Sequence, residues 1–292
     1  MRNIIQELAG FQIMFLKKVN KKNSKFNVVI FGGSSGLGKD ISDQFNKKEY
    51  SLYIFGKNRV KKIKNQNCHY KKCDLSKLTD VKKNIYYIKK KIKTIDLLIL
   101  NSAVINFKKK MLEEKYEYMY FVNFLSQFII LFNLKKNINN SILKTIVIIS
   151  SHVIFFNKFR LFDLQSLNNF NFWNSYKNSK YLLSIMAKNL FIESKNMNFL
   201  LFNPGRLNSN LGYSKSFFGF LSKIYHLLFG IKTHIVAKRL YKILIKLLNK
   251  KIFFCYYSKG NLINLKKKNK DLFNYNLSKK IFNKLKNDKI LV

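Results

Sequence analysis

Tyr176 and Lys180 stand four positions apart in a stretch whose apolar spacing predicts a helix over about residues 173–194. On a helix, side chains at that spacing lie on one face, a turn apart. A phenol titrates near pH ~10, but an adjacent ammonium favours the phenolate and lowers the phenol pKa towards neutrality. The pair therefore predicts proton transfer by Tyr176, although chance Tyr-x-x-x-Lys matches also occur in a chain with 16 tyrosines.

A glycine-rich turn follows the first apolar run, residues 28–31, and precedes a predicted helix over residues 38–48. Glycines let the backbone approach a pyrophosphate closely, and a helix N-terminus offers unpaired N–H groups and the positive end of its dipole. The spacing is G-x-x-x-G-x-G rather than G-x-G-x-x-G. The residues expected to cradle the phosphates of a dinucleotide are Gly32, Ser34, Ser35, Gly36, Leu37 and Gly38.

The end of the second predicted strand, residues 51–55, bears on the choice of nucleotide. An acidic residue there would bond the ribose 2′-hydroxyl of NAD and repel a 2′-phosphate. The chain instead has Gly56 and Lys57, and no carboxylate stands between Glu49 and Asp74. NADP(H) is therefore the expected cofactor in preference to NAD, with Lys57 near the 2′-phosphate.

The elements that must position these residues alternate between strands and helices. Apolar runs predict strands directly before Asp74 and at residues 28–31, 51–55, 96–100, 145–149, 198–202 and 252–256, and helical spacing predicts helices over residues 38–48, 76–91, 112–134, 173–194 and 233–248. Strands that are apolar throughout belong to a parallel sheet covered on both faces. We expect a Rossmann-type, doubly wound three-layer α/β sandwich with a mainly parallel, seven-stranded sheet. Residues 26–292 are expected to form one domain whose tail docks as a helix.

In their order, the motifs resemble those of the short-chain dehydrogenases/reductases over roughly residues 26–290. The glycine turn matches the family's T-G-x-x-x-G-x-G with Phe31 in place of Thr, and Asp74-Leu75 matches its D-[VL] element. Residues 100–103, L-N-S-A, are similar to its N-N-A-G, with Leu for Asn, Ser for Ala and Ala for Gly. The resemblance implies that Asp74 bonds the adenine edge and that further cofactor contacts come from Leu75, Asn101, Ser102 and Ala103.

The same resemblance implies a catalytic tetrad and hydride transfer between NADP(H) and a carbonyl or alcohol carbon. Tyr176 exchanges the proton, and Lys180 holds the ribose hydroxyls and tunes Tyr176. Ser151 hydrogen-bonds the substrate oxygen, and Asn123 bends its helix and holds a water of the proton relay. Taken only as residues, Ser151 also fits a turn or helix cap, and Asn123 is unremarkable in an Asn-rich chain.

Three further stretches are similar to the subgroup that contains retinol dehydrogenases, the WW-domain oxidoreductase and protochlorophyllide reductase. They are the long interval between Ser151 and Tyr176, residues 115–117, and residues 203–209. In the last stretch, the resemblance implies that Pro204, Leu207 and Ser209 contact the nicotinamide carboxamide. Pro204 is the chain's one proline, which favours a required turn over a chance one.

Residues 206–232 are expected to cover the substrate as a lid, as the equivalent segment does in this fold. Residues 216–230 are apolar with few charges, which favours a lipophilic carbonyl or alcohol as substrate. A helix packed on the core and a contact with a membrane surface are the alternatives.

The 292 residues carry a formal charge of +42, yet only five of the 56 basic residues are arginine. Abundant lysine, asparagine, isoleucine and phenylalanine are typical of an AT-rich genome, so we expect no specific nucleic-acid partner. Two alternatives to an enzyme remain: a catalytically weak NADP(H)-binding scaffold or sensor, and a basic nucleic-acid-binding protein.

The three cysteines predict neither a disulfide framework nor a metal site, and no apolar run is long enough to span a membrane. Residues 1–25 form an extension that fits an amphipathic anchor, a targeting segment or a lead-in helix. We expect an intracellular protein, either cytoplasmic or peripheral to a membrane. Organelle targeting and the oligomeric state stay open.

Overall fold

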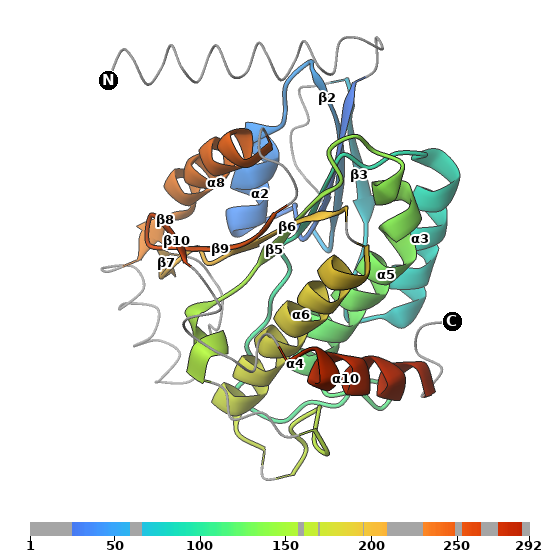
Figure 1. The fold of residues 1–292 in the computed structure, drawn as a ribbon, viewed down its shortest axis with the longest axis vertical. Coiled ribbons are helices and arrows are strands. Elements are labelled where there is room, and N and C mark those ends of the chain that lie inside the picture. Colours follow the sequence, from blue (N-terminus) through green and yellow to red (C-terminus); the bar gives the residue numbers. More distant parts are fainter. Residues whose placement is uncertain are drawn as a thin grey trace.

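A computed structural model describes residues 25–58, 66–156, 161–168, 170–194, 196–208, 230–248, 253–263 and 274–287. Among them, eight strands form one sheet in the order β10-β9-β6-β5-β4-β1-β2-β3 (Figure 1). The strands are β1 (Phe26–Phe31), β2 (Tyr50–Gly56), β3 (Cys68–Lys72), β4 (Leu97–Leu100), β5 (Thr145–Ile149), β6 (Asn198–Phe202), β9 (Phe254–Ser258) and β10 (Asn261–Ile263). All neighbours pair in parallel except β9 and β10. The mainly parallel sheet is confirmed, but the expected number of seven strands is wrong because β10 adds an antiparallel edge.

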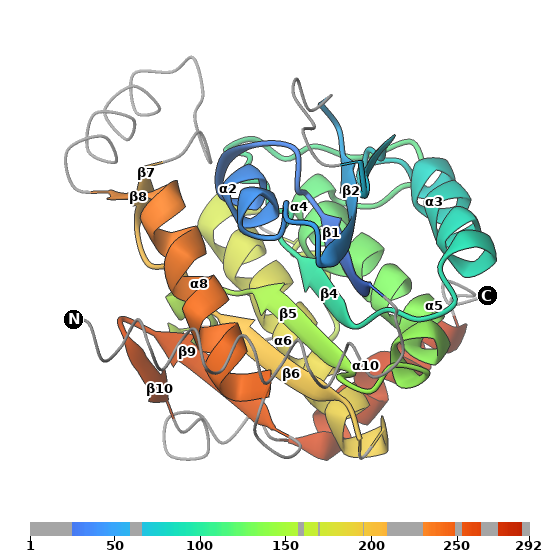
Figure 2. The ribbon, with the colours of Figure 1, turned by 90° about the horizontal axis from the view of Figure 1, so that it is seen from above.

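Helices cover both faces of this sheet and complete the three layers of the predicted doubly wound fold (Figure 2). One layer holds α2 (Gly36–Gln44) and α8 (Thr233–Leu248), and the other holds α3 (Leu78–Lys91), α5 (Ser126–Asn139), α6 (Phe172–Ser194) and α10 (Tyr275–Asn287). Successive residues of β1 face opposite layers, since Ile30 packs with the α2 and α8 side chains and Phe31 with those of α5. Burial on both faces explains the continuous apolar runs of the strands.

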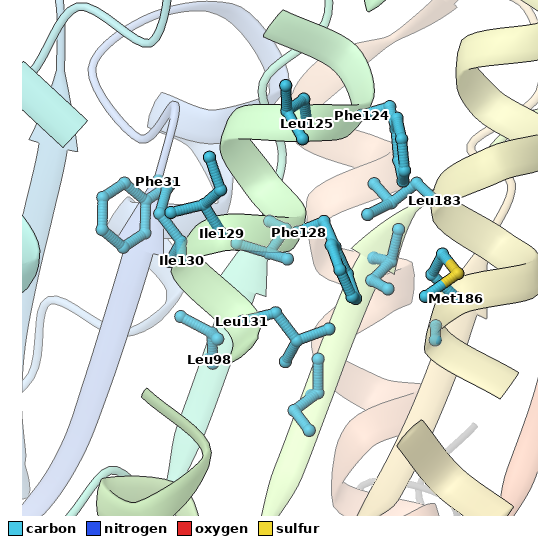
Figure 3. Close-up of a cluster of buried hydrophobic side chains, with 14 of the residues drawn as sticks. Phe31, Leu98, Phe124, Leu125, Phe128, Ile129, Ile130, Leu131, Leu183 and Met186 are labelled. Carbon is cyan, nitrogen blue, oxygen red and sulfur yellow. The ribbon is translucent and has the colours of Figure 1, made fainter. Parts of the chain in front are cut away.

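A cluster of buried hydrophobic side chains lies between the sheet and helices α5 and α6 (Figure 3). Phe128 of α5 and Leu183 and Met186 of α6 are at most 1% exposed there. Because protein interiors are closely packed, the buried side chains between these helices constrain the distance between them. The side chains that α6 and the turn before α5 carry therefore have fixed positions relative to each other.

The predicted helix over residues 112–134 differs most from the structure. The helical segment begins with α4 (Tyr118–Tyr120), passes through the π turn η1 (Phe121–Leu125) and ends with α5 at Asn139. Before it, Lys115 takes the left-handed conformation, with φ 62°. The Glu117 side chain accepts a hydrogen bond from the Tyr120 N–H at 2.8 Å and caps the helix there. The predicted start is wrong because Leu112 packs on the core from a turn, not from a helix.

The C-terminal helix α10 docks on the core, as predicted. Ile281 and Leu285 are fully buried, and Ser278 Oγ donates to Asn189 Oδ1 of α6 at 3.0 Å.

The last predicted strand, residues 252–256, corresponds to β9 and lies about two residues later. None of the described helices is long and apolar enough to cross a membrane. Residues 1–24 of the expected extension and 209–229 of the expected lid lie outside the described residues.

Candidate functional site

The glycine turn after β1 is held against two neighbouring segments. Gly32 has φ 78°, and a Cβ there would lie 2.8 Å from the backbone nitrogen of Ser102. Its own N–H donates to the Phe55 carbonyl of β2 at 2.7 Å. Gly36 has φ 50°, and an added Cβ would meet no atom within 4 Å. Close packing requires the first glycine, while the second borders open space at the start of α2.

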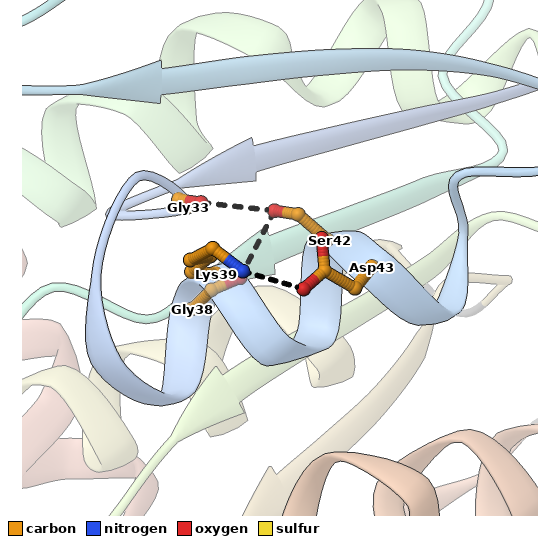
Figure 4. A network of polar contacts seen from close by, with 5 residues as sticks. All are labelled: Gly33, Gly38, Lys39, Ser42 and Asp43. Atoms are coloured by element: carbon orange, nitrogen blue, oxygen red, sulfur yellow. Dashed lines mark hydrogen bonds and ion pairs between the residues drawn. The ribbon is translucent and has the colours of Figure 1, made fainter. Parts of the chain in front are cut away.

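The start of α2 offers backbone donors for an anion. Ser35 precedes the helix, and its side chain makes no capping hydrogen bond. Inside the helix, Ser42 Oγ lies 3.0 Å from the Gly33 carbonyl and 2.9 Å from the Gly38 carbonyl, which ties the turn to the helix (Figure 4). The turn that contains Gly32 and Gly36, called the glycine cradle below, and the uncapped start of α2 together fit the pyrophosphate of a dinucleotide.

Lys57 after β2 and Asp74 after β3 form an ion pair, with 3.0 Å between Lys57 Nζ and Asp74 Oδ2. Ser76 donates to Asp74 Oδ1 through both its N–H, at 3.0 Å, and its hydroxyl, at 2.7 Å. Burial opposes the charge of Asp74, but the bonds from Ser76 and Lys57 outweigh it and lower the Asp74 pKa. The Asp74 hydrogen bond and charge raise the pKa of Lys57, so both groups stay ionised at neutral pH.

The loop after β4 braces the glycine turn. Asn101 Nδ2 donates to the Gly32 carbonyl at 2.9 Å, and the Asn101 N–H donates to the Phe31 carbonyl at 3.0 Å. Ser102 packs against Gly32, and Ala103 follows it, half-buried. Residues 100–103 depart from the family's N-N-A-G, but Ser102 and Ala103 are small where the loop passes the glycine turn.

Asn123 lies at the centre of the π turn and is fully buried. Its Oδ1 accepts the Val104 N–H at 2.7 Å, and its Nδ2 lies 2.9 Å from the Val104 carbonyl. The same Nδ2 donates to Ser179 Oγ at 3.1 Å. Ser179 in turn donates to the Tyr176 carbonyl at 2.8 Å. Asn123 thus joins the loop after β4 to the helix that carries Tyr176.

Tyr176 and Lys180 are 7% and 3% exposed, on the face of α6 that meets the end of β5. Burial raises the pKa of Tyr176 to about 12, and a hydrogen bond with Ser151 opposes that rise. Lys180 Nζ donates to the Ile149 carbonyl at 3.0 Å, and burial lowers its pKa to about 8. The expected fall in the Tyr176 pKa is therefore wrong for this structure, because desolvation of the phenolate outweighs the stabilising contacts.

The turn after β6 is built around the single proline. Asn203 Nδ2 donates to Ser258 Oγ at 2.8 Å, and its Oδ1 accepts the Gly205 N–H at 3.1 Å, where φ is 79°. Pro204 and Leu207 are half-buried in this segment. A second, two-stranded sheet pairs β7 (Leu207–Asn208) with β8 (Ile231–Lys232), so the two ends of the expected lid lie side by side. Ser209 lies outside the described residues.

Most of the predicted residues thus follow the carboxyl ends of β1 to β6, which meet at one edge of a parallel sheet, where this type of fold binds ligands. Leu37 and Leu75 are each 6% exposed and belong to the core, while Ser34 packs against Gly56.

Sequence reasoning missed Ser76, Ser179 and Gln127. Only Ser76 had a local signal, since an aspartate followed two residues later by serine is a common turn pattern.

Comparisons with known proteins agree with this geometry. A sequence model described as short chain dehydrogenase matches residues 27–212. An alcohol dehydrogenase from Thermococcus sibiricus complexed with 5-hydroxy-NADP is similar in structure, with TM-score 0.58 and 19% identity over 82% of this chain and 100% of that chain. A short chain dehydrogenase from Salmonella enterica has TM-score 0.57 and 15% identity over 78% of this chain and 93% of that chain. A search of curated proteins gave no significant match.

Proposed function

The chain belongs to the short-chain dehydrogenase family, and we propose that it is an NADP(H)-dependent enzyme acting on a lipophilic carbonyl or alcohol. Membership of the family makes it an oxidoreductase that uses a nicotinamide cofactor and a small-molecule substrate. The bound nicotinamide would supply the hydride to a carbonyl carbon or accept it from an alcohol carbon. The observation that carries the proposal is the grouping of Tyr176, Ser151 and Lys180 at the sheet edge that bears the glycine cradle.

The cofactor-binding part of the proposal uses residues from five strand ends. Gly32, Gly36 and the start of α2 would hold the pyrophosphate, and Asp74 would meet the adenine. Lys57, whose side chain is 66% exposed, would turn from Asp74 towards a 2′-phosphate. Further contacts would come from Asn101, Ser102 and Ala103 after β4 and from Pro204, Leu207 and Ser209 after β6.

The proton would be transferred by Tyr176. With a pKa of about 12, this phenol is protonated at neutral pH and fit to give its proton to the substrate oxygen, which is the direction of carbonyl reduction. The Ser151 hydroxyl, which already bonds Tyr176, would donate to the same oxygen. Lys180 would hold the ribose hydroxyls and pass a proton to Tyr176, and a water organised by Asn123 would restore the proton of Lys180 from solvent.

A lipophilic substrate is supported by the surroundings of Tyr176. The Trp173 ring stacks on the Tyr176 ring with 6.0 Å between centroids, yet Trp173 is 45% exposed. A partly exposed indole beside the proton donor provides an apolar surface for a substrate. The proposal also keeps the resemblance to the retinol dehydrogenase-like subgroup, which rests on residues 115–117, residues 203–209 and the long interval between Ser151 and Tyr176.

The decisive experiment follows NADPH and NADH oxidation by the purified chain with retinal, steroid, quinone and short aldehyde substrates. We expect NADPH oxidation with a lipophilic carbonyl and a fall of at least about 100-fold in kcat for Tyr176→Phe. The matched control is Tyr86→Phe, which removes a phenol hydroxyl from a residue that is 68% exposed on α3. Unchanged carbonyl reduction by Tyr176→Phe would show that Tyr176 is not the proton donor.

A scaffold or sensor is the second candidate, favoured by the departures of residues 100–103 from the family's N-N-A-G and by the engagement of Lys180 with the Ile149 carbonyl. It predicts NADPH binding in the micromolar range or tighter, with no turnover on any member of the panel. Turnover that depends on Tyr176 excludes this candidate.

A further inference from the structure

The π turn η1 leaves backbone acceptors that a side chain from the next turn satisfies. In a π turn the hydrogen-bond ladder of the helix slips by one residue, so nearby carbonyls need other donors. Gln127 Nε2 lies 3.0 Å from the carbonyl oxygens of both Val122 and Asn123. Gln127 is 1% exposed, so no solvent can replace this donor. Its amide therefore closes the slipped turn in which Asn123 stands.

The same nitrogen also bonds outside its helix. Gln127 Nε2 lies 2.9 Å from the carbonyl oxygen of Ser102, in the loop after β4. That loop packs against Gly32, and its Asn101 side chain holds the Gly32 carbonyl. An amide group has two hydrogens, which are shared here among three carbonyls. One buried amide thus joins the turn of Asn123 to the loop that braces the glycine cradle.

Asn123 holds the far end of the same loop. Its side chain bonds both the N–H and the carbonyl of Val104, and it donates to Ser179, which donates to the Tyr176 carbonyl. A connected set of hydrogen bonds therefore runs from Ser102 through Gln127 and Asn123 to the helix of Tyr176. Buried networks of this kind are rigid only when every member is satisfied.

We propose that Gln127 is a positioning residue, whose amide locks the π turn to the Ser102 carbonyl and thereby places Asn123 and Tyr176 relative to the cofactor loop. The kinetic consequence rests on the proposed function, whereas the structural consequence does not. Gln127→Met keeps the size of the side chain and removes both N–H donors. The carbonyls of Ser102 and Asn123 then lose this donor, while the Val122 carbonyl still accepts from Ser126 Oγ at 3.2 Å.

Hydrogen–deuterium exchange of the full chain, measured by mass spectrometry, tests the structural consequence without any substrate. Gln127→Met is expected to speed exchange about tenfold in peptides over residues 101–106 and 121–127. The matched control is Asn133→Leu, which removes from the same helix an amide whose hydrogen bonds, within the described part of the chain, are with the Ile129 carbonyl and Lys89. The control should leave both peptides unchanged. Equal exchange in Gln127→Met and the wild type at both peptides overturns the proposal.

Steady-state kinetics with the best carbonyl of the panel test the positioning role. Gln127→Met is expected to lower kcat about 10- to 100-fold with the carbonyl KM within about twofold, because misplacement affects the reacting geometry more than binding. Asn133→Leu should retain kcat. Faster exchange with an unchanged kcat shows that Gln127 is only structural and overturns the proposal. If the wild type reduces no carbonyl, the proposed function fails, while the exchange result still decides whether Gln127 holds the loop.

Discussion

Lys57 and Lys180 lie at the same edge of the sheet, and their surroundings have opposite effects on their charges. Lys57 exposes 66% of its side chain and pairs with Asp74, whose hydrogen bond raises the Lys57 pKa. Lys180 is 3% exposed and donates to a neutral carbonyl, and burial lowers its pKa to about 8. Lys57 is therefore a permanent cation, whereas Lys180 can change its charge near neutral pH.

One sheet edge would therefore bind the two ends of the proposed dinucleotide with different chemistry. The wet end around Lys57 uses ionised groups that suit phosphates and are screened by salt. The dry end around Lys180 uses neutral hydrogen bonds from Asn123, Ser151 and Ser179, and any charge that forms there is unscreened. Substitutions at the two lysines should therefore differ in size, in pH dependence and in salt dependence.

The largest expected effect is on turnover. Lys180→Met should lower kcat for carbonyl reduction about 100- to 1000-fold, because it removes the group proposed to hold the ribose and to return the proton. The control is Lys177→Met on the same helix, where the half-buried lysine is one residue from Tyr176 but has no assigned role. Initial rates of NADPH oxidation give kcat for both variants. Equal losses in both variants would mean that positive charge on α6, and not Lys180 itself, supports turnover.

The next effect is on stability against pH. The Lys180 pKa is about 8 in the folded chain and 10.5 when unperturbed, so between these values the unfolded chain binds one more proton than the folded one. Stability relative to Lys180→Met must then rise with pH, by on the order of 2 kcal/mol between pH ~8 and ~10. Urea unfolding of both proteins across this range measures it. A difference that stays flat or falls would show that Lys180 is solvated and that the two lysines do not differ as described.

The sequence was sufficient to predict the mainly parallel sheet because its strands are buried on both faces. The run at residues 145–149 has no polar face to mark a helix, and it forms β5 with the predicted bounds. The π turn could not be predicted, because it depends on Asn123 and Gln127 reaching a loop more than 18 residues away in the chain. The edge strand β10 follows a two-residue turn at Lys259 and Gly260, whose φ values of 50° and 90° suit a hairpin, a signal that the helical spacing of the tail obscured.

The candidate site was predictable in its residue types but not in its contacts. The sequence singled out Tyr176 and Lys180 as a pair, but it singled out Lys57 and Asp74 separately. The contact between Lys57 and Asp74 depends on strand order, which brings the ends of β2 and β3 together. Strand order likewise places the Ile149 carbonyl of β5 where Lys180 donates to it. The direction of the Tyr176 pKa shift was mispredicted because burial, which no spacing rule reports, is the larger influence there.

A smaller effect is expected on cofactor choice. Lys57→Met should weaken NADPH binding about tenfold and leave NADH binding within about twofold, because only NADPH carries the 2′-phosphate that a lysine can pair with. Lys39→Met is the matched control, since Lys39 is also half-exposed and paired with an aspartate, Asp43, at 2.8 Å. Fluorescence titration with each nucleotide at two salt concentrations gives the ratio. If both nucleotides weaken equally in Lys57→Met, its charge acts on the dinucleotide as a whole and Lys57 does not select NADP(H).

The smallest effect is the contribution of the Lys57–Asp74 pair to stability. A double-mutant cycle with Lys57→Met and Asp74→Asn should give a coupling of about 0.5 kcal/mol in low salt and less in high salt, because Lys57 is mostly solvated. In the folded chain the pKa of Asp74 lies below its ordinary value of 3.8. The stabilisation by the pair is therefore present above pH 3.8 and is lost as the pH falls through the lower pKa of the folded chain. Urea unfolding of the four proteins at neutral and acid pH measures both. A coupling above about 2 kcal/mol that resists salt would place Lys57 in a dry environment like that of Lys180, and the contrast between the two ends of the site would then no longer hold.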